Sequence, residues 1–247
     1  IPGGTYVLYD DGAEVILTAT RDGLSKDSDN AKDWNDGQPT EASDKQAVSY
    51  RALFIAGPSE KGQELAAKVN AGEALTWEDV SSANWSVANS SSPAGYIYPS
   101  LWLQENFEKN ITDLPHAVQS DSYGSAFARL ASGQVDILCT YADARRDYED
   151  EWTGEYGMTN SIWDDTAVVG VTPAIYNDTI SVSKTSPIMD DDFKAALSEA
   201  FINIGNTEEG KEVIAIYSHN GYLPAQSSDY DSERAAQEMI QSLNSAG

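Results

Sequence analysis

The chain has 247 residues, of which 40 are Asp or Glu and 15 are Lys or Arg, so its formal charge at pH 7 is −25. This balance argues against a nucleic-acid partner, because phosphate backbones are bound by clustered basic side chains. With 40% hydrophobic residues, the chain can bury a core large enough for one large domain or two modest lobes. No stretch approaches the ~18–20 consecutive apolar residues of a membrane span.

The first half of the chain alternates short apolar runs with polar segments. Two short strands are expected at residues 7–8 and 15–17, on either side of a turn at Gly12. Residues 22–45 show little apolar periodicity and many turn-forming residues, so we expect an irregular surface loop there. Four further elements are expected in chain order: a strand within 47–57, a helix over 59–71, a short helical turn before 80 and a strand at 85–88.

The second half has clearer helical periodicity. A helix is expected over 98–110, and residues 122–141 predict a helix, a glycine stop and a buried strand. Residues 190–205 begin with acidic side chains, which favour a helix N-terminus, and residues 231–243 predict a last helix. Within residues 190–205, apolar residues recur at steps of three and four: Phe193, Leu197, Ala200, Phe201 and Ile204. Strands that alternate with helices predict an α/β fold with largely parallel sheets.

Sequence motifs of catalysis are scarce. His116 and His219 lie far apart and outside HExxH spacing, which argues against a zinc hydrolase. Cys139 lies in an apolar run, so we expect a small buried core residue that forms no internal disulfide. Neighbouring carboxylates such as Asp164 and Asp165 have the chemistry of a glycosidase, but a chain with 40 acidic residues contains such pairs by chance. We therefore expect no catalytic residues and no cofactor.

The acidic stretch DSDNAKDWNDG, residues 27–37, offers several oxygen ligands of the kind that calcium prefers. An EF-hand loop needs those ligands at alternate positions and a glycine at the sixth, and no frame of this stretch provides both. An acidic surface loop without a metal is the expectation.

The stretch NSSSPAGYIYP, residues 89–99, gathers uncharged hydrogen-bond donors in front of a predicted helix. The first N–H groups of a helix have no intrahelical partner and carry the positive end of its dipole, so they bind an oxyanion without a lysine. Ser92 suits the N-cap, Pro93 suits the first helical position, and Gly95 allows close approach of a ligand to the backbone. Pro99 requires the helix to kink or to restart there. An oxyanion cradle and an ordinary solvated loop before a helix both fit the stretch.

Four stretches together resemble, in order, the phosphate/phosphite/phosphonate class of ABC-transporter substrate-binding proteins. They are SSSPAGYIYPSLWL (90–103), SYGSAFARLASGQVDILCTY (122–141), TPAIYNDTISVS (172–183) and GYLPAQSSDYDSERAAQEM (221–239). The resemblance implies a two-lobed type II periplasmic-binding-protein fold with a hinge of crossing strands. It also implies a receptor that is not an enzyme, captures a small phosphorus oxyanion in the cleft between its lobes and passes it unchanged to a membrane permease.

The serine stretch gains ligand-binding residues from this resemblance. Ser91 and Ser92 correspond to the oxyanion-binding hydroxyls of the family, and Gly95 belongs to the same cradle. Ala94 stands where a further hydroxyl is common in the family, which implies that one side-chain contact is missing here.

Other implied ligand contacts are spread along the chain. IPGGTYVLY resembles the lobe I ligand loop, which implies that Thr5 and Tyr6 face the ligand. Ser122 lies in a loop where family members often carry a histidine at the position of Tyr123, so these two residues are expected to contact the ligand through different chemistry. Asp143 falls near a strand end that presents polar groups in the family, and its carboxylate would favour a ligand that carries an amine.

The resemblance also implies a division of the chain. Family members have a further portion of lobe I ahead of the segment that resembles IPGGTY, so lobe I is expected to be incomplete. Its expected residues are 1–52 with 206–247, and lobe II is expected at 53–205. By analogy the protein is expected to be a monomer outside the cytoplasm, either periplasmic or a cell-surface lipoprotein. The net charge does not oppose anion capture, because exposed charges are screened over about 8 to 10 Å.

One alternative comes from a different functional class. A secreted acidic hydrolase that cleaves a glycan with a carboxylate pair also fits the composition. The two classes differ in a simple observable, because a receptor binds its ligand stoichiometrically whereas a hydrolase converts it.

Overall fold

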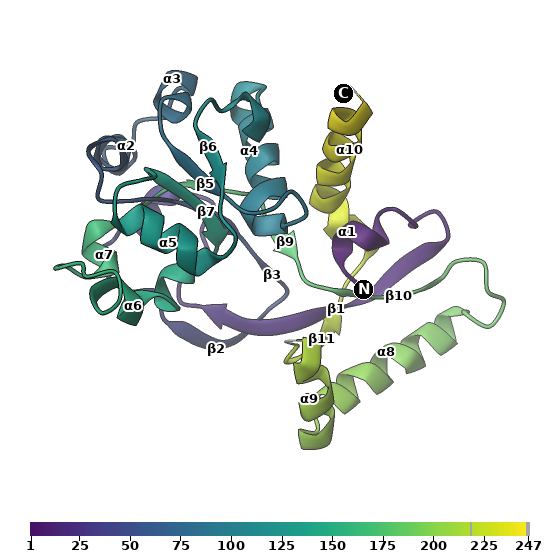
Figure 1. The fold of residues 1–247 in the computed structure, drawn as a ribbon. Helices are drawn as coiled ribbons and strands as arrows, with labels where there is room; N and C mark the ends of the chain where they lie inside the picture. The colour runs from purple at the N-terminus through teal and green to yellow at the C-terminus, as the bar shows by residue number, and fades with distance from the viewer. Residues whose placement is uncertain (218, 246–247) are drawn as a thin grey trace. The chain divides into compact units, whose positions relative to one another are not determined.

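A computed structural model describes residues 1–217 and 219–245, which fall into two compact units (Figure 1). Unit 1 consists of Ile1–Gly23, Ala42–Tyr50 and Ala174–Gly247, and unit 2 consists of Leu24–Glu41 and Arg51–Pro173. The chain therefore passes between the two units several times.

These boundaries differ from the expected lobes. Residues 174–205 belong to unit 1, because they include a strand that pairs with the long N-terminal strand of that unit. Residues 24–41 belong to unit 2, although they precede the expected start of lobe II. Of the expected segment 206–247, residues 218, 246 and 247 lie outside the described residues.

Unit 2 contains one five-stranded sheet in the order β6-β5-β7-β4-β8. Its strands are β4 (Ala52–Ala56), β5 (Trp85–Val87), β6 (Ala117–Gln119), β7 (Ile137–Tyr141) and β8 (Ala167–Val171). β5 runs parallel to β6 and β7, whereas β4 runs antiparallel to both β7 and β8. The predicted largely parallel sheet is therefore confirmed in unit 2, with β4 as the exception.

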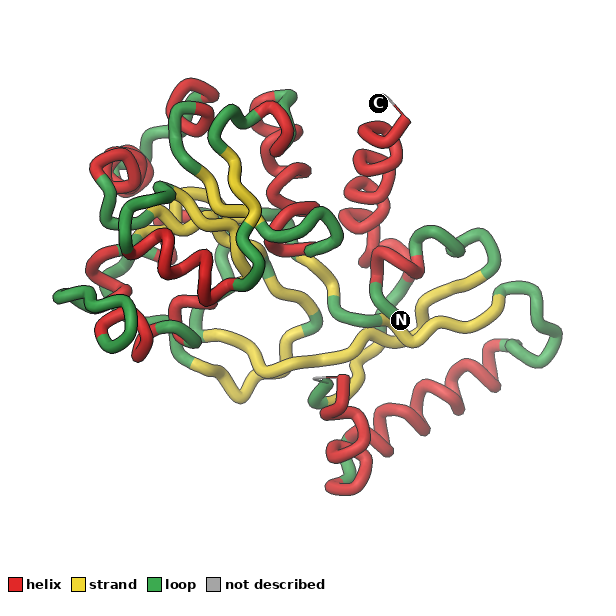
Figure 2. Tube along the Cα trace, viewed as in Figure 1, coloured by secondary structure: helices red, strands yellow, loops and turns green. Residues whose placement is uncertain are grey.

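Helices cover both faces of this sheet (Figure 2). They are α2 (Glu60–Asn70), α3 (Trp77–Ser81), α4 (Tyr98–Phe107), α5 (Tyr123–Ala131), α6 (Glu149–Thr153) and α7 (Ile162–Asp165). Shorter helical turns are η1 (Ala31–Trp34), η2 (Pro93–Ile97, a π turn), η3 (Ile111–Asp113) and η4 (Ala144–Arg146).

The alternation of side chains along the strands separates two apolar clusters. On β4, Phe54 faces a cluster that includes residues of α2 and α4, while Leu53 faces a cluster built with α5 and α6. The Phe54 ring meets Trp102 of α4 edge to face, with ring centroids 4.6 Å apart. Each large apolar side chain buried in this way contributes about 1.5–3 kcal/mol. The two clusters hold α4 and α5 on opposite faces of the sheet.

Unit 1 contains an antiparallel arrangement in which β1 (Ala13–Leu24) lies between β10 (Thr179–Ser183) and β11 (Gly221–Pro224). β2 (Ala42–Ala47) also pairs with β1, and β3 (Ser49–Tyr50) pairs with β9 (Ile175–Tyr176). Its helices and turns are α1 (Gly3–Tyr6), α8 (Asp191–Gly205), α9 (Glu208–Ile214), α10 (Asp231–Ser245), η5 (Ala215–Tyr217) and η6 (Ser227–Tyr230). The expectation of parallel pairing is wrong for the pairs β1–β10, β1–β11 and β3–β9.

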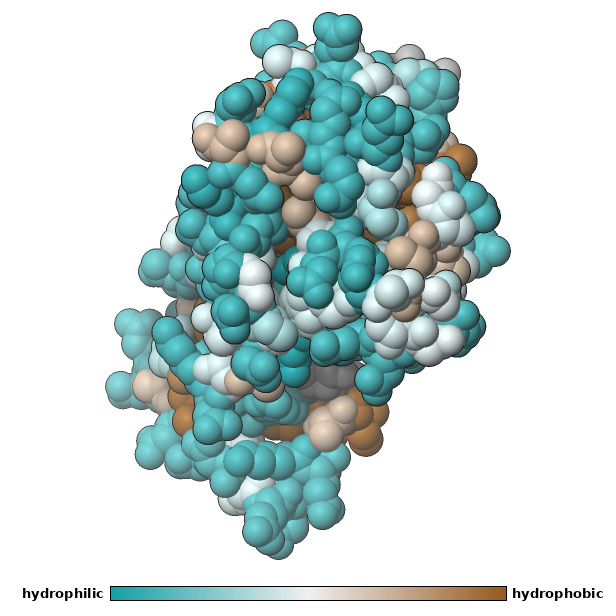
Figure 3. Space-filling model, turned by 90° about the vertical axis from the view of Figure 1, so that its left-hand side faces the viewer, coloured by the Kyte–Doolittle hydropathy of each residue, from teal (hydrophilic) through white to brown (hydrophobic). Residues whose placement is uncertain are grey.

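Most expected helices are present, and the clearest differences lie near the N-terminus. The strand expected at residues 7–8 is wrong, because the Val7 N–H donates to the Gly3 carbonyl at 3.0 Å and ends a helical turn. The strand expected at 15–17 is part of the longer β1. No described helix has both the length and the apolar character needed to cross a membrane. The face in Figure 3 is mainly hydrophilic, as the 22% of charged residues would suggest.

Candidate ligand-binding site

The topology of unit 2 marks one place on its sheet. The neighbouring strands β5 and β6 are followed by α4 and α5, which pack on opposite faces. In sheets of this kind, ligands bind beyond the carboxyl ends of the strands at the point where the connections diverge. The loops after β5 and β6 therefore define the expected position of a site.

A cavity of about 170 Å³ lies at this position. Its lining residues come from the end of β5, the loop after it, the loop after β6, the first turns of α5, and β7: Val87, Ala88, Asn89, Ser92, Ser120, Asp121, Ser122, Tyr123, Ala126, Leu138 and Cys139. Among these described lining residues none is Lys, Arg or His, and Asp121 alone carries a charge. The cavity thus offers hydroxyl and amide groups together with one carboxylate.

Ser92 caps the helical segment that follows β5. Its Oγ accepts a hydrogen bond from the Gly95 N–H at 3.2 Å, and its carbonyl accepts from the Ile97 N–H at 3.0 Å. α4 then begins at Tyr98 with Pro99 in its first turn, so of the two predicted alternatives, a kink or a restart at this proline, the structure shows the second. The predicted N-cap role of Ser92 is confirmed as well.

Gly95 and Ala94 do not line the cavity. A Cβ atom at Gly95 would lie 2.4 Å from the Cβ of Ala88, so this glycine permits close packing of the helix start on the end of β5. Its N–H is already paired with Ser92, and Ala94 is 4% exposed. The close contact between the helix start and Ala88 therefore explains the glycine at position 95.

Ser91 is exposed and lies outside the cavity lining. Its Oγ donates to Oδ1 of Asn89 at 2.6 Å, and its N–H donates to the same oxygen at 3.1 Å. Asn89 lines the cavity. The hydroxyl proton of Ser91 is therefore used inside the loop.

A second helix start lines the same cavity. Ser122 caps α5 by accepting a hydrogen bond from the Ser125 N–H at 3.1 Å, and the Ser125 Oγ accepts from the Ser122 N–H at 3.3 Å. The N–H groups of Tyr123 and Gly124 lie in the first turn of α5, where no intrahelical acceptor exists. The structure thus brings Ser92, Ser122 and Tyr123 together, as three of the predicted site residues.

Tyr123 contributes a phenol that stays neutral. Burial raises the pKa of Tyr123, and the interaction of its hydroxyl with the Ser92 side chain opposes that rise. The Tyr123 ring meets Tyr141 edge to face, with centroids 5.1 Å apart, which fixes its orientation. A neutral phenol can donate a hydrogen bond without changing its charge near neutral pH.

Ser120, Asp121 and Cys139 line the cavity and were not predicted as site residues. The hydroxyls of Ser120 and Ser86 share a hydrogen bond of 2.7 Å between their oxygens. Cys139 is fully buried, as predicted, and burial raises the pKa of its thiol, so it forms an uncharged wall. The polar run that follows β6 was the sequence signal for the first two of these residues.

Asp143 has a structural environment and does not line the cavity. Its side chain is buried, with Oδ2 2.7 Å from Nη2 of Arg145 and 2.9 Å from Oγ1 of Thr40. Its Oδ1 accepts from the Arg145 backbone N–H at 3.1 Å. Both carboxylate oxygens are thus occupied within unit 2, in contrast to the expected contact with a ligand amine.

Thr5 and Tyr6 belong to unit 1. Thr5 is exposed, whereas Tyr6 is fully buried and donates from its hydroxyl to Oγ of Ser227 at 2.7 Å. The Tyr6 ring meets Tyr230 edge to face at 5.7 Å between centroids. The Tyr6 hydroxyl therefore stabilises the N-terminal turn of this unit.

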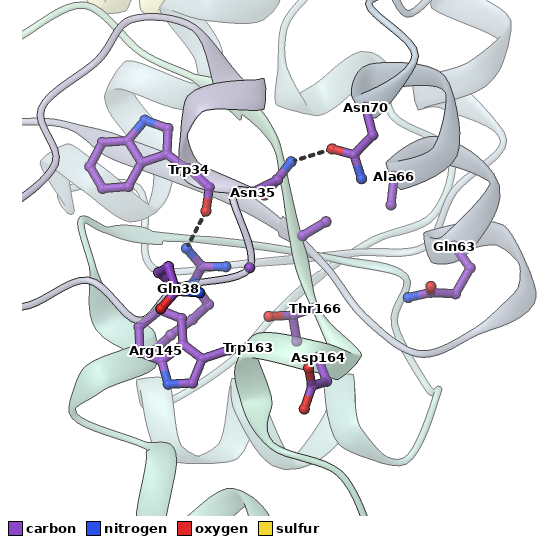
Figure 4. Close-up of a pocket in the computed structure, with 12 residues that line it drawn as sticks. Trp34, Asn35, Gln38, Gln63, Ala66, Asn70, Arg145, Trp163, Asp164 and Thr166 are labelled. Atoms are coloured by element: carbon purple, nitrogen blue, oxygen red, sulfur yellow. Dashed lines mark hydrogen bonds between the residues drawn. The ribbon is translucent and has the colours of Figure 1, made fainter.

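A second cavity of unit 2, of about 150 Å³, lies beside the β8 edge of the sheet (Figure 4). The side chain of Asn35 forms two hydrogen bonds with that edge: it donates to the Val168 carbonyl at 2.8 Å and accepts from the Val168 N–H at 2.7 Å. Figure 4 also shows the hydrogen bonds from Asn35 to Asn70 and from Arg145 to the Trp34 carbonyl. Most polar groups that line this second cavity therefore form hydrogen bonds within unit 2.

Comparison with known proteins places the chain in a family. Residues 1–230 match the family described as the periplasmic substrate-binding protein of phosphonate ABC transporters. The chain therefore belongs to this family of binding proteins, and its α/β fold is that of a type II periplasmic binding protein. A search of curated proteins gave no match.

Solved structures with the same fold include two further binding proteins. A Xanthomonas citri protein solved with ATP bound has a TM-score of 0.60 and 13% identity, over 98% of this chain and 77% of the other. Mh-p37 of Mycoplasma hyorhinis, proposed to transport thiamine pyrophosphate, has a TM-score of 0.62 and 14% identity, over 91% of this chain and 72% of the other. Identities this low show a shared fold and leave the ligand of this chain to be argued from its own residues.

Proposed function

We propose that the protein captures a small phosphorus oxyanion, namely a phosphonate, phosphate or phosphite, as the solute-binding component of an ABC transporter. One observation carries the proposal: two helix starts, capped by Ser92 and Ser122, line a single cavity at the diverging ends of β5 and β6. Membership of a phosphonate-binding family supports the same ligand class.

The donors of this cavity suit an anion although none of them is charged. The oxygens of Ser92 and Ser122 accept hydrogen bonds in their caps, and the hydroxyl proton of Ser122 remains available to a ligand. Ser92 and the Tyr123 phenol are hydrogen-bonded to each other, so together they offer one further hydroxyl proton to a ligand. The dipole of α5 places positive potential at its first turn. A hydrogen bond to a charged group contributes about 1.5–3 kcal/mol, so a few such donors account for tight binding without a lysine.

The hydrolase alternative finds no support at the carboxylate pair considered for it. Asp164 accepts a hydrogen bond from the Ser161 hydroxyl at 2.7 Å. Asp165 accepts from the Trp152 indole at 3.1 Å and from the Asn160 amide at 2.9 Å. These bonds fix loops of unit 2, so we favour binding without chemical conversion.

The proposed setting follows from the family. The protein acts as a monomer outside the cytoplasmic membrane, as a periplasmic protein or a cell-surface lipoprotein, and delivers its ligand to a permease. The expected surplus of acidic surface charge is compatible with anion capture, because that charge is screened over about 8 to 10 Å while the cavity donors act at contact distance.

Isothermal titration calorimetry with methylphosphonate, phosphite and phosphate tests the proposal. We expect one bound ligand per chain for at least one of these compounds. Phosphorus NMR of the same mixtures should show the ligand unchanged after prolonged incubation. Absence of binding to all three compounds, or the appearance of a new phosphorus signal, would contradict the proposed function.

A further inference from the structure

We propose that Asn110 carries an N-linked glycan on the folded protein. The inference goes beyond the proposed function, because it concerns the loop before β6, at the opposite end of the parallel strands from the ligand cavity. The modification is an oligosaccharide that is transferred from a lipid-linked glycosyl phosphate outside the cytoplasm, which is the compartment that the family implies.

Four segments of the sequence have the acceptor pattern Asn-X-Ser/Thr, in which X is not proline. They begin at Asn84, Asn89, Asn110 and Asn177. The pattern alone does not choose among them, because a glycan is bulky and needs a surface position with an available amide nitrogen. The surroundings of each asparagine decide.

Asn110 presents its amide nitrogen from a loop that the fold holds in place. Its Oδ1 accepts from the Thr112 N–H at 2.9 Å and from the Thr112 hydroxyl at 2.5 Å. Its Nδ2, the atom that receives a sugar, has no hydrogen bond within the described part of the chain and is not buried. Ile111 is 4% exposed and packs in the apolar cluster of α2 and α4, which fixes the loop with Thr112 exposed.

Asn84 and Asn177 use their amide nitrogens inside the fold. The Nδ2 of Asn84 donates to the Asp136 carboxylate at 2.9 Å, and Ser86 of the same pattern is fully buried. Asn177 is 4% exposed, and its Nδ2 donates to the Ala19 carbonyl at 3.1 Å. Neither nitrogen can accept a sugar unless the surrounding structure opens.

Asn89 shares the local turn of Asn110, because its Oδ1 accepts from the N–H and the hydroxyl of Ser91. Asn89 lines the ligand cavity, however, and an oligosaccharide there would block entry of a ligand. The loop of Asn110 is separated from the capped segment at Ser92 by α4, whose ten residues span about 15 Å. The choice of Asn110 over Asn89 rests on the proposed function.

The transfer balances without an oxidant or a reductant. A bond forms between the Asn110 Nδ2 and the anomeric carbon of the first sugar, and the bond from that carbon to the phosphate oxygen of the lipid-linked donor breaks. One amide proton leaves with the released lipid phosphate. The Thr112 hydroxyl, which is bonded to the same amide group, is the second residue type that the acceptor pattern requires.

The test incubates the purified, folded chain with a single-subunit oligosaccharyltransferase and a lipid-linked oligosaccharide, and locates the glycan by mass spectrometry of proteolytic peptides. It compares the parent with Asn110→Gln, Thr112→Ala and Thr112→Ser. The matched control is Asn106→Gln, because Asn106 is exposed near the end of α4 and belongs to no acceptor pattern. Synthetic peptides that span the four patterns show how the same enzyme treats unfolded acceptors.

We expect one glycan per folded chain, at Asn110, in the parent, in Asn106→Gln and in Thr112→Ser. Asn110→Gln and Thr112→Ala should lose it, and the peptides of Asn84 and Asn177 should be modified although these residues are not modified in the folded chain. A folded parent that stays unmodified at Asn110 while the Asn110 peptide is modified would overturn the proposal, and so would transfer to Asn89 in place of Asn110. The glycan is located without a phosphorus ligand, so this result is independent of the calorimetry that tests the proposed function.

Discussion

The two cavities of unit 2 are similar in volume, about 170 Å³ and about 150 Å³, but their polar groups do different things. In the cavity between the helix starts, the Ser122 hydroxyl retains a proton after its cap is formed, and the hydrogen-bonded pair of Ser92 and Tyr123 retains one more. In the cavity beside β8, the guanidinium of Arg145 and the amide of Asn35 are bound to the protein itself. Size and polarity alone do not identify a ligand site; several unused hydrogen-bonding groups around one cavity do, whereas among the described lining residues beside β8 only the Trp163 indole N–H is buried without a partner.

The cavity beside β8 is polar because it closes an edge of the sheet. A strand at an edge exposes N–H and C=O groups, and Asn35 satisfies both of these groups on Val168. The buried pair of Asp143 and Arg145 then anchors η4, and Arg145 also lies over the Trp163 ring at 4.7 Å. These contacts stabilise unit 2, so the comparison predicts that substitutions here change stability and leave ligand affinity intact.

The largest expected effect belongs to Arg145. Replacement by Met leaves the Asp143 carboxylate buried without its cation, and loss of one partner of a buried pair costs about 3–5 kcal/mol. Urea-induced unfolding should report this loss of stability. Calorimetry below the unfolding transition should give the ligand dissociation constant of the parent.

The control for this variant neutralises both partners. In Asp143→Asn combined with Arg145→Met, no charge is left uncompensated, and stability should recover in large part. A folded Arg145→Met variant whose ligand affinity falls tenfold would break the comparison, because it would show that the cavity beside β8 takes part in binding.

The next effect concerns Ser92. Ser92→Ala removes a hydroxyl that donates to the anion, so we expect affinity to fall about ten- to a hundredfold. Ser92→Asp keeps a capping oxygen but places a carboxylate against the ligand, so binding should be lost while the protein stays folded. Calorimetry measures the first effect, and melting curves without ligand separate it from the cap loss of about 1 kcal/mol in the alanine variant.

Ser91→Ala is the matched control, because the same residue type is changed one position earlier. The Ser91 hydroxyl already donates to Asn89, so its removal should change the affinity less than about threefold. Equal losses of ligand affinity in Ser91→Ala and Ser92→Ala would contradict the prediction. They would mean that the substitutions act through the structure of the loop and that neither hydroxyl contacts the ligand.

Local patterns predicted the parts of the site that depend on local structure. The sequence Ser-Pro before an apolar run indicated the cap at Ser92. The missing N–H of Pro99 indicated that the helix kinks or restarts there, without deciding between the two. The helix and strand of residues 122–141 were visible in the spacing of apolar residues around a glycine. The family resemblance, confirmed over residues 1–230, supplied the fold class and the ligand class.

What the sequence did not reveal depends on contacts between distant residues. Nothing in the sequence indicated that Asp143 has a partner within the protein. That partner, Thr40, is 103 residues away along the chain, so local patterns could not show the hydrogen bond. Gly95 suggested an approach by a ligand, but the atom that requires a glycine there belongs to Ala88 of the same chain. Asp121 was overlooked because the strand that precedes it, β6, is only three residues long and gave no clear pattern.

The smallest expected effect is that of Tyr123→Phe. The variant keeps the ring against Tyr141 and removes a neutral donor, whose net contribution of about 0.5–1.5 kcal/mol corresponds to roughly a two- to tenfold loss of affinity. Burial raises the pKa of Tyr123 in the folded protein, so its neutral form is favoured there. The stability from this group is therefore complete below the ordinary tyrosine pKa of about 10 and is lost only as the pH rises through the raised value. An ultraviolet titration should show the phenolate signal of Tyr123 above that ordinary range, as the difference between the parent and the variant. If Tyr123→Phe binds phosphonate as tightly as the parent, the phenol is part of the cavity wall, and the anion is held by the two helix starts alone.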